Sequence, residues 1–151
     1  MIRILSEKSE MVNPEINLYA NKKRLAWLQN QIFDDHPSAA LQHQSVIANE
    51  MLNAGYTQQS IDQYNNVLYT IDSLKINPPE VFMTAIQDLL AITHFRHGEE
   101  TNCLDGHNAE SCIMPIRGAG IHRNKNNAEI AINIYKSLLE KNPKDYVYRW
   151  L

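Results

Sequence analysis

The sequence predicts an all-α protein built from stacked helical hairpins, and three observations support this. Gly and Pro are scarce, with 5 and 6 copies in 151 residues, whereas helix-favouring residues fill long uninterrupted stretches. Apolar side chains recur at helical spacings along most of the chain. The stretches end at Pro, Gly or Asn, which is typical of helix boundaries. With 44% apolar residues the chain is long enough for one buried core, so we expect a single helical repeat domain over residues 1–151.

The first half of the chain predicts one amphipathic helix followed by a helical hairpin. Leu18, Leu25, Leu28 and Ile32 lie at helical spacings, so we expect a helix over residues 17–32. A second helix is expected to begin at Ser38, whose hydroxyl can cap it, and to end near Gly55. Residues 57–74 predict a third helix with one continuous apolar stripe. The second and third helices should form a hairpin.

The second half predicts two further long helices and the start of a sixth. The sequence Asn77-Pro78-Pro79-Glu80 is a typical helix start, and the helix that follows is expected to end near His97. Apolar residues cover most of its circumference, so it should be the core helix. A similar capping pattern over residues 126–129 predicts a fifth helix that ends at Pro143, and the sixth begins at Lys144-Asp145.

Two parts of the chain repeat the same residue pattern. Small, aromatic, medium and helix-ending positions recur at spacings of 4, 3 and 5 in two series: Ser60, Tyr64, Val67 and Asp72, and Ala131, Tyr135, Leu138 and Pro143. This order resembles the second helix of a tetratricopeptide repeat. The matching first-helix residues, Ala48 and Ala91, lie 12 and 40 residues earlier. The second hairpin therefore carries 28 extra residues, which predicts an insertion over about residues 98–125.

The predicted insertion contains both cysteines, four of the five glycines, and two histidines. Cys103 and Cys112 enclose a loop that a disulfide can close in an oxidising compartment. Two free, buried thiols are the alternative in the cytosol. A third possibility is a zinc site of both cysteines with His107 and His122, although Cys-x3-His-x4-Cys-x9-His is not a familiar zinc-finger spacing. We expect His107 and His122 to hydrogen-bond within the loop and thereby to order it.

Charge and motif content disfavour several classes of function. The formal net charge is -3, which gives no basic stripe for nucleic acid, and no apolar run reaches the length of a membrane span. We find no nucleophile with a base, no paired carboxylates and no phosphate-binding loop, so we expect neither an enzyme nor a cofactor. Gly118-Ala119-Gly120 should form a tight turn. His94 and His97 are expected to lie near a helix C-terminus, where the helix dipole favours their charge.

The leading hypothesis from the residues is a non-catalytic protein-interaction or scaffolding module. The inner faces of the first helices of the two hairpins are predicted to line a groove for a protein partner, with Ser45, Asn49, Asn53, Asp88, Ile92 and Arg96. The rival hypothesis is a metal-binding or redox module that uses the cysteines and histidines of the insertion.

One segment resembles a known family: Asn102-Cys103-Leu104-Asp105-Gly106-His107-Asn108-Ala109-Glu110-Ser111-Cys112-Ile113-Met114-Pro115-Ile116, followed by Gly118-Ala119-Gly120-Ile121-His122. Together with Tyr19-Ala20-Asn21-Lys22-Lys23-Arg24 and Arg149-Trp150-Leu151, it resembles the N-terminal helical region of bacterial proteins related to cartilage acidic protein, which carry FG-GAP (VCBS) repeats and an ASPIC/UnbV segment. The resemblance implies a helical region before a β-propeller in an exported protein, hence periplasmic, cell-surface or extracellular. The chain lacks the propeller repeats, and its apolar end at Trp150-Leu151 predicts a fragment of a longer protein.

Overall fold

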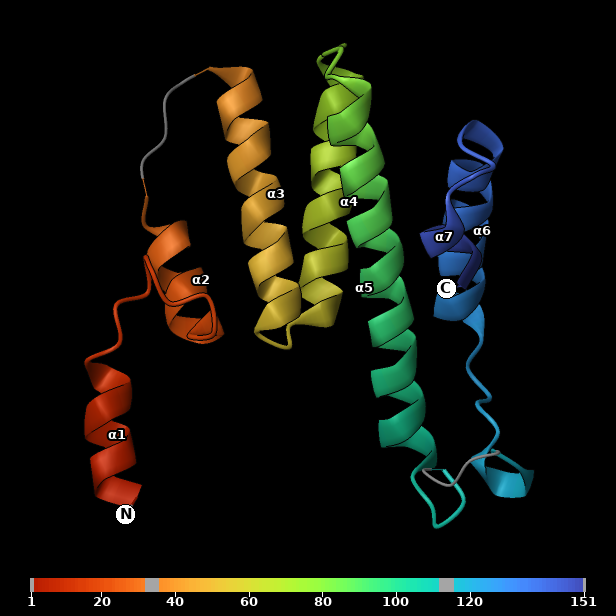
Figure 1. The fold of residues 1–151 in the computed structure, drawn as a ribbon, viewed down its shortest axis with the longest axis horizontal. Helices are drawn as coiled ribbons and strands as arrows, with labels where there is room; N and C mark the ends of the chain where they lie inside the picture. Colours follow the sequence, from red (N-terminus) through yellow and green to blue (C-terminus); the bar gives the residue numbers. More distant parts are fainter. Residues whose placement is uncertain (1, 32–35, 112–115, 151) are drawn as a thin grey trace. The chain divides into compact units, whose positions relative to one another are not determined.

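A computed structural model describes residues 2–31, 36–111 and 116–150, and the described residues are helical without any strand (Figure 1). The all-α prediction is therefore confirmed. The residues group into two compact units, Met1–Thr70 and Ile71–Leu151, which are described separately. The single domain expected from the length stays a prediction. The elements in chain order are α1 Ile2–Glu10, α2 Asn21–Gln29, α3 Pro37–Asn53, α4 Thr57–Ser73, α5 Glu80–Gly106, the 3-10 turn η1 Gly118–Gly120, α6 Asn126–Lys141 and α7 Tyr146–Trp150.

The first unit contains the predicted hairpin, in which α3 and α4 run antiparallel (Figure 1). Gly55 has a φ of +83° at the end of α3, and the Tyr56 amide donates to the Met51 carbonyl across it. Ala48 and Ser60 are both fully buried, and the Ser60 hydroxyl donates to the Ala48 carbonyl over 2.7 Å. These small residues therefore let the two helices approach closely, as the repeat pattern predicts.

Helix α2 covers a second core in the first unit. Leu25 and Leu28 pack with Ile47 of α3, and partly buried residues surround them, namely Trp27, Met51 and Ala54. Arg24 anchors the preceding segment, because its guanidinium contacts Glu50 Oε2 at 3.3 Å and donates to the Pro14 and Glu15 carbonyls. The Arg24 side chain therefore links the segment around Pro14 and Glu15 to α3.

The helix expected over residues 17–32 is shorter than predicted. It begins at Asn21, and Leu18 is exposed, whereas Ile32 lies outside the described residues. The reason is local: the Asn17 side-chain oxygen accepts from the Tyr19 amide and holds a turn where the helix was expected to begin. Helix α1 was not predicted, and Ile4 and residues 6–10, whose burial in this helix is described, are all exposed.

The second unit is built on the α5–α6 hairpin, whose helices run antiparallel (Figure 1). Its core unites Ala91 of α5 with Ala131, Tyr135 and Leu138 of α6. These residues correspond to Ala48, Ser60, Tyr64 and Val67 of the first hairpin, and all eight are buried. Helix α7 packs on α6 through Tyr148, whose ring centroid lies 5.5 Å from that of Tyr135. The repeated pattern therefore marks equivalent buried positions.

The predicted end of the fourth helix near His97 is wrong, because α5 continues to Gly106. Gly98 lies inside the helix, where a Cβ atom would come within 3.3 Å of Asn127 Cβ on α6. This glycine serves close helix packing and does not end the helix. His94 is accordingly not near a helix end. It is buried, and its Nδ1 lies 2.8 Å from Asn127 Oδ1. Val81 and Phe95 of the same helix are exposed, so its apolar surface is not buried all round.

Three helix starts differ from the predicted caps. His36 rather than Ser38 caps α3, with its Nδ1 accepting from the Ser38 amide at 3.4 Å. Pro79 occupies the N-cap position of α5 and Lys125 that of α6, and neither forms a side-chain cap hydrogen bond. Asn and Ser near a helix start therefore indicate its region but not the capping residue.

No described helix is both long and apolar enough to cross a membrane.

Candidate functional site

The predicted groove residues of the first unit differ in exposure. Ser45 is buried, and its hydroxyl donates to the Leu41 carbonyl of the same helix, so it is turned to the interior. Asn49 is half-buried and Asn53 is exposed. The Asn53 carbonyl accepts from the Asn21 side chain at 2.6 Å. Asn53 also lines a cavity, which is described below.

The predicted groove residues of the second unit lie on α5, and two of them line a cavity between α5 and α6. This cavity has a volume of about 250 Å³, and its lining is mostly apolar: Ile92, Phe95, Arg96, Ala128, Ala131, Ile132 and Tyr135. Phe95 and Ile132 are 45% and 48% exposed, so apolar surface reaches solvent at this place. We call it the α5–α6 cleft. Arg96 supplies its charge and contacts Glu99 at 3.1 Å.

The third residue, Asp88, belongs to a polar cluster in the second unit. Asp88 Oδ1 and Tyr135 Oη are buried, and neither has an aligned hydrogen-bond partner among the described residues. The groups are still close enough to influence each other's protonation. Burial raises the pKa of Asp88, the Tyr135 hydroxyl lowers it in part, and the Asp145 charge raises it further. Burial and the Asp88 charge raise the pKa of Tyr135. We interpret this as a close but imperfectly aligned contact.

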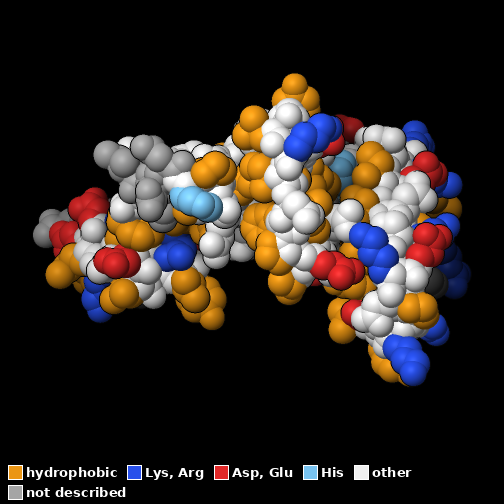
Figure 2. Space-filling view, turned by 90° about the horizontal axis from the view of Figure 1, so that it is seen from above, with side chains coloured by type: hydrophobic (Ala, Val, Ile, Leu, Met, Phe, Trp, Pro, Cys, Tyr) orange, Lys and Arg blue, Asp and Glu red, His pale blue; other side chains and the backbone are white. Residues whose placement is uncertain are grey.

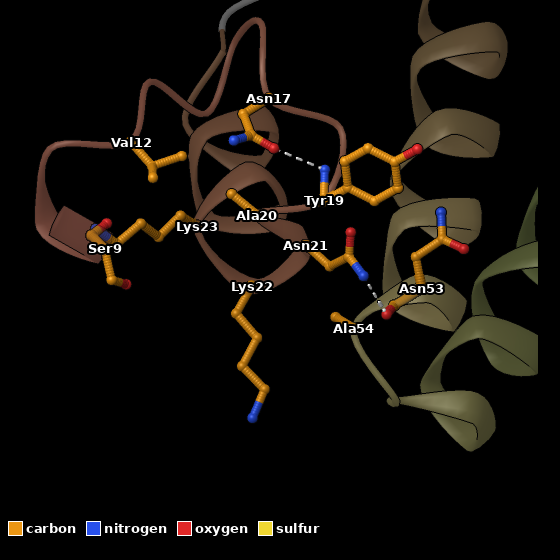
Figure 3. A pocket seen from close by; sticks show the side chains of 10 residues that line it. All are labelled: Ser9, Val12, Asn17, Tyr19, Ala20, Asn21, Lys22, Lys23, Asn53 and Ala54. Carbon is orange, nitrogen blue, oxygen red and sulfur yellow. Dashed lines mark hydrogen bonds between the residues drawn. The ribbon is translucent and has the colours of Figure 1, made fainter. Parts of the chain in front are cut away.

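A cavity of about 450 Å³ in the first unit lies beside the start of α2 (Figure 3). We call it the α2 pocket. Its wall comes from α1, the turn before α2, the first turn of α2 and the end of α3: Ser9, Val12, Asn17, Tyr19, Ala20, Asn21, Lys22, Lys23, Asn53 and Ala54. The Asn17 side chain holds the turn through the Tyr19 amide, as the dashed line in Figure 3 shows. Tyr19 itself is 95% exposed. A fixed turn therefore presents an aromatic ring to solvent.

Lys22 and Lys23 give the α2 pocket its charge, and among the described residues that line it there is no carboxylate. Lys23 Nζ donates to the Ser9 carbonyl, which ties the pocket floor to α1. Lys22 Nζ lies 5.8 Å from the centre of the Tyr56 ring and points away from the turn in Figure 3. On the face drawn in Figure 2, Lys and Arg are interspersed with Asp and Glu.

The described part of the insertion is ordered by asparagine, serine and glutamate side chains. Asn102 and Asn124 bond reciprocally, because Asn102 Nδ2 donates to the Asn124 carbonyl at 2.7 Å and Asn102 Oδ1 accepts from the Asn124 amide at 2.9 Å. Asn108 Nδ2 donates to the carbonyls of Gly106 and Ala119. The Ala119 amide donates to Glu110 Oε2, and a Cβ at Gly120 would come within 2.4 Å of the Glu110 carbonyl oxygen. The predicted tight turn at residues 118–120 is confirmed.

The role expected for the two histidines of the insertion, to order the loop by hydrogen bonds, stays a prediction. His107 and His122 are exposed and line a cavity of about 310 Å³, and neither ring forms a hydrogen bond with another described residue. Cys103 is exposed on α5 and forms no disulfide within the described part of the chain. Its expected partner, Cys112, lies outside the described residues. The disulfide therefore stays a prediction. Among the described residues, no group of three His, Cys, Asp or Glu side chains could hold a metal ion.

Sequence reasoning missed the residues that form the α2 pocket, apart from Asn53. Two features of the sequence could have indicated this pocket, namely the turn-forming asparagines and the aromatic and cationic residues that follow them. Asn13 and Asn17 precede turns in which each side chain accepts from the amide two residues later, a frequent property of asparagine. Tyr19, Lys22 and Lys23 follow directly. Comparison with protein-family models, curated proteins and solved structures finds no match to this chain.

Proposed function

We propose that this chain is a non-catalytic protein-interaction module, whose α5–α6 cleft receives apolar side chains from another protein or from another domain of its parent protein. The cleft itself carries the proposal. Its lining residues are apolar apart from Arg96 and Tyr135, whose hydroxyl is buried, and Phe95 and Ile132 are half-exposed. Exposed apolar surface beside a cavity is characteristic of binding sites.

The chemistry of the lining supports recognition. Arg96 can pair with a carboxylate of the partner, while Phe95 and Ile132 bury its apolar side chains. Bond-making would require a nucleophile or a general base positioned by a neighbour, and the residues that line the cleft supply neither. We therefore assign the cleft to binding.

A random peptide library displayed on phage tests this function. Peptides selected on the whole chain should carry apolar residues, and Phe95→Ser should weaken their binding about ten-fold, as expected when burial of one aromatic side chain is lost. Val81→Ser is the matched control, because Val81 is an exposed apolar residue of the same helix outside the cleft. Selected peptides whose affinity is equal for the wild type and Phe95→Ser would contradict the assignment.

We also propose that the two hairpins are tetratricopeptide-like and that the chain comes from an exported protein of the ASPIC/UnbV-containing family. The burial of equivalent small and aromatic residues in both hairpins supports the first statement. The second rests on the resemblance, and the pair Cys103 and Cys112 would suit an oxidising compartment.

The mass of the chain tests the cysteine pair. Protein purified from an oxidising compartment should be two mass units lighter than after reduction, and it should resist alkylation until it is reduced. Immediate alkylation of both thiols would overturn the disulfide. Zinc that protects both thiols from alkylation would instead support the rival metal-binding hypothesis.

A further inference from the structure

The α2 pocket has a chemistry that the apolar α5–α6 cleft lacks. Two lysines line it without a carboxylate among its described lining residues, so its electrostatic potential favours an anion. Lys22 is exposed, and the only contact described for its ammonium group is with the Tyr56 ring, which leaves its hydrogens free for an acceptor. The pocket therefore offers positive charge to a ligand.

Hydrogen-bond donors lie in the same wall. Asn53 and Asn17 each have a side-chain NH₂ group for which the described residues provide no acceptor. At the start of α2, Ala20 occupies the N-cap position and provides no side-chain acceptor for the first-turn amides. These donors supplement the lysines, since amides of an uncapped first turn also favour negative charge.

The exposed Tyr19 indicates the class of ligand. Its ring stands beside the pocket on a turn fixed by Asn17, and ordered aromatic side chains supply much of the binding energy at protein interfaces. Asparagine amides pair well with a peptide backbone, because each offers both a donor and an acceptor. A ring, amides and ammonium groups together fit a peptide that carries carboxylates. The net charge of -3 disfavours a long polyanion such as nucleic acid.

We propose that the α2 pocket binds an acidic peptide segment of a partner protein. A glutamate or aspartate side chain pairs with Lys22, the segment's backbone bonds to the amides of Asn17 and Asn53, and an apolar residue packs on Tyr19. This inference is independent of the apolar cleft, since it concerns other residues and a ligand that is mainly acidic rather than mainly apolar.

The test measures binding of an end-blocked, fluorescein-labelled peptide with the sequence Glu-Glu-Phe-Glu-Glu to the whole chain by fluorescence anisotropy. Lys22→Gln should weaken binding about five-fold, which corresponds to one partly exposed ion pair. Lys136→Gln, at an exposed lysine of α6, should change nothing. Tyr19→Ala should weaken binding more than Tyr69→Ala, a control at another exposed tyrosine. Circular dichroism confirms that each variant is folded.

Three outcomes would overturn the proposal. The first is no binding at millimolar protein, and the second is equal affinity for the matched peptide Gln-Gln-Phe-Gln-Gln. The third is displacement of the peptide by millimolar inorganic phosphate at constant ionic strength, which would make the pocket a phosphate site. The variant Phe95→Ser separates the two proposals, because it should leave the acidic peptide bound even if the α5–α6 cleft has no role in binding.

Discussion

The two hairpins of this chain bury the same positions although their connections differ greatly. Residues 54–56 join α3 to α4, whereas residues 107–125 join α5 to α6. In both hairpins a small residue of the first helix and a small, an aromatic and an aliphatic residue of the second are buried. The comparison indicates that packing between the helices, rather than the connection, determines the hairpin. A long connection costs little extra entropy once its ends are fixed.

The hairpins differ in how their small residues meet. Ser60 donates to the Ala48 carbonyl in the first, whereas Ala91 and Ala131 meet in the second without side-chain polar groups. Small size is therefore the shared requirement, and the hydrogen bond is an addition in one hairpin. Two of the predictions below compare the hairpins directly, one concerns their different connections, and one compares the ends of α3 and α4.

The largest expected effect is at the aromatic position. Tyr64 is fully buried and Tyr135 is 6% exposed, so replacing either with Ala should leave a cavity. We expect Tyr64→Ala to lower the free energy of unfolding by about 3–5 kcal/mol and Tyr135→Ala by less, measured by urea denaturation. Tyr64→Phe is the control. It should be neutral or stabilising, because the Tyr64 hydroxyl is buried without a partner among the described residues. A strong loss with Tyr64→Phe would contradict this reasoning.

The connection of the second hairpin should depend on the Asn102–Asn124 pair. Asn102→Ala removes both hydrogen bonds of this pair, and we expect a local loss of about 1–2 kcal/mol. Amide exchange should accelerate over residues 107–125 and stay unchanged in the core of α6. Asn133→Ala, at an exposed asparagine of α6, is the control. Equal acceleration throughout α5 and α6 would show that the connection and the hairpin form one cooperative unit.

The ends of α3 and α4 share one backbone arrangement with different residues. The Tyr56 amide donates to the Met51 carbonyl across Gly55, and the Ile76 amide donates to the Ile71 carbonyl across Lys75. Gly55 and Lys75 have φ values of +83° and +53°, which lie in the left-handed region, where residues other than glycine are strained. Lys75→Gly should therefore stabilise the protein and Gly55→Ala should destabilise it, each by about 0.5–1 kcal/mol in thermal unfolding. Shifts of the same sign would refute the shared geometry.

The smallest effect concerns buried carboxylates. Burial raises the pKa of Glu50 in the first unit, and the Arg24 guanidinium partly lowers it, whereas burial raises the pKa of Asp88 in the second unit and no cation among the described residues lowers it. A raised pKa means that Asp88 favours folding when protonated, and this contribution is lost as the pH rises through its folded-state pKa. Asp88→Asn should thus stabilise the protein at pH 7 by less than about 1 kcal/mol, and not at pH 3.

Glu50→Gln provides the contrast for this pH dependence. It should destabilise the protein at pH 7, because it leaves Arg24 without its carboxylate partner. Thermal unfolding of both variants at the two pH values makes the comparison. A lower melting temperature for Asp88→Asn at pH 7 would mean that the carboxylate of Asp88 stabilises the fold.

The buried positions were predictable because spacing along a helix directly reflects which side chains share a face. Ala48, Ser60 and Tyr64 illustrate this. Helix ends were less predictable, because Gly98 resembles a helix end in the sequence and its role depends on Asn127, which is distant in the chain. His94 was misread for the same reason. Its partner is also Asn127.

The candidate sites likewise differ in how far helical spacing in the sequence could predict them. Ile92 and Arg96 were predicted to lie along the inner face of one helix, and both line the α5–α6 cleft. The α2 pocket escaped prediction, because it joins a turn, a helix start and the end of another helix. Asn53 was expected to line a groove because of its helix position, and it now lines this pocket instead. Surfaces made from several irregular elements leave no periodic signal.

Asn102 and Asn124 are hydrogen-bonded to each other where the insertion leaves the two helices. Next to this pair, Gly98 lets α6 approach α5 closely. Among the described residues, these two hydrogen bonds join the two ends of the segment between the asparagines. We therefore expect the irregular connection over residues 107–123 to tolerate a change of length or composition while the α5–α6 core keeps its packing. Mutation during evolution, or protein design, can then change the surface that this connection exposes without a change in the helices of the hairpin.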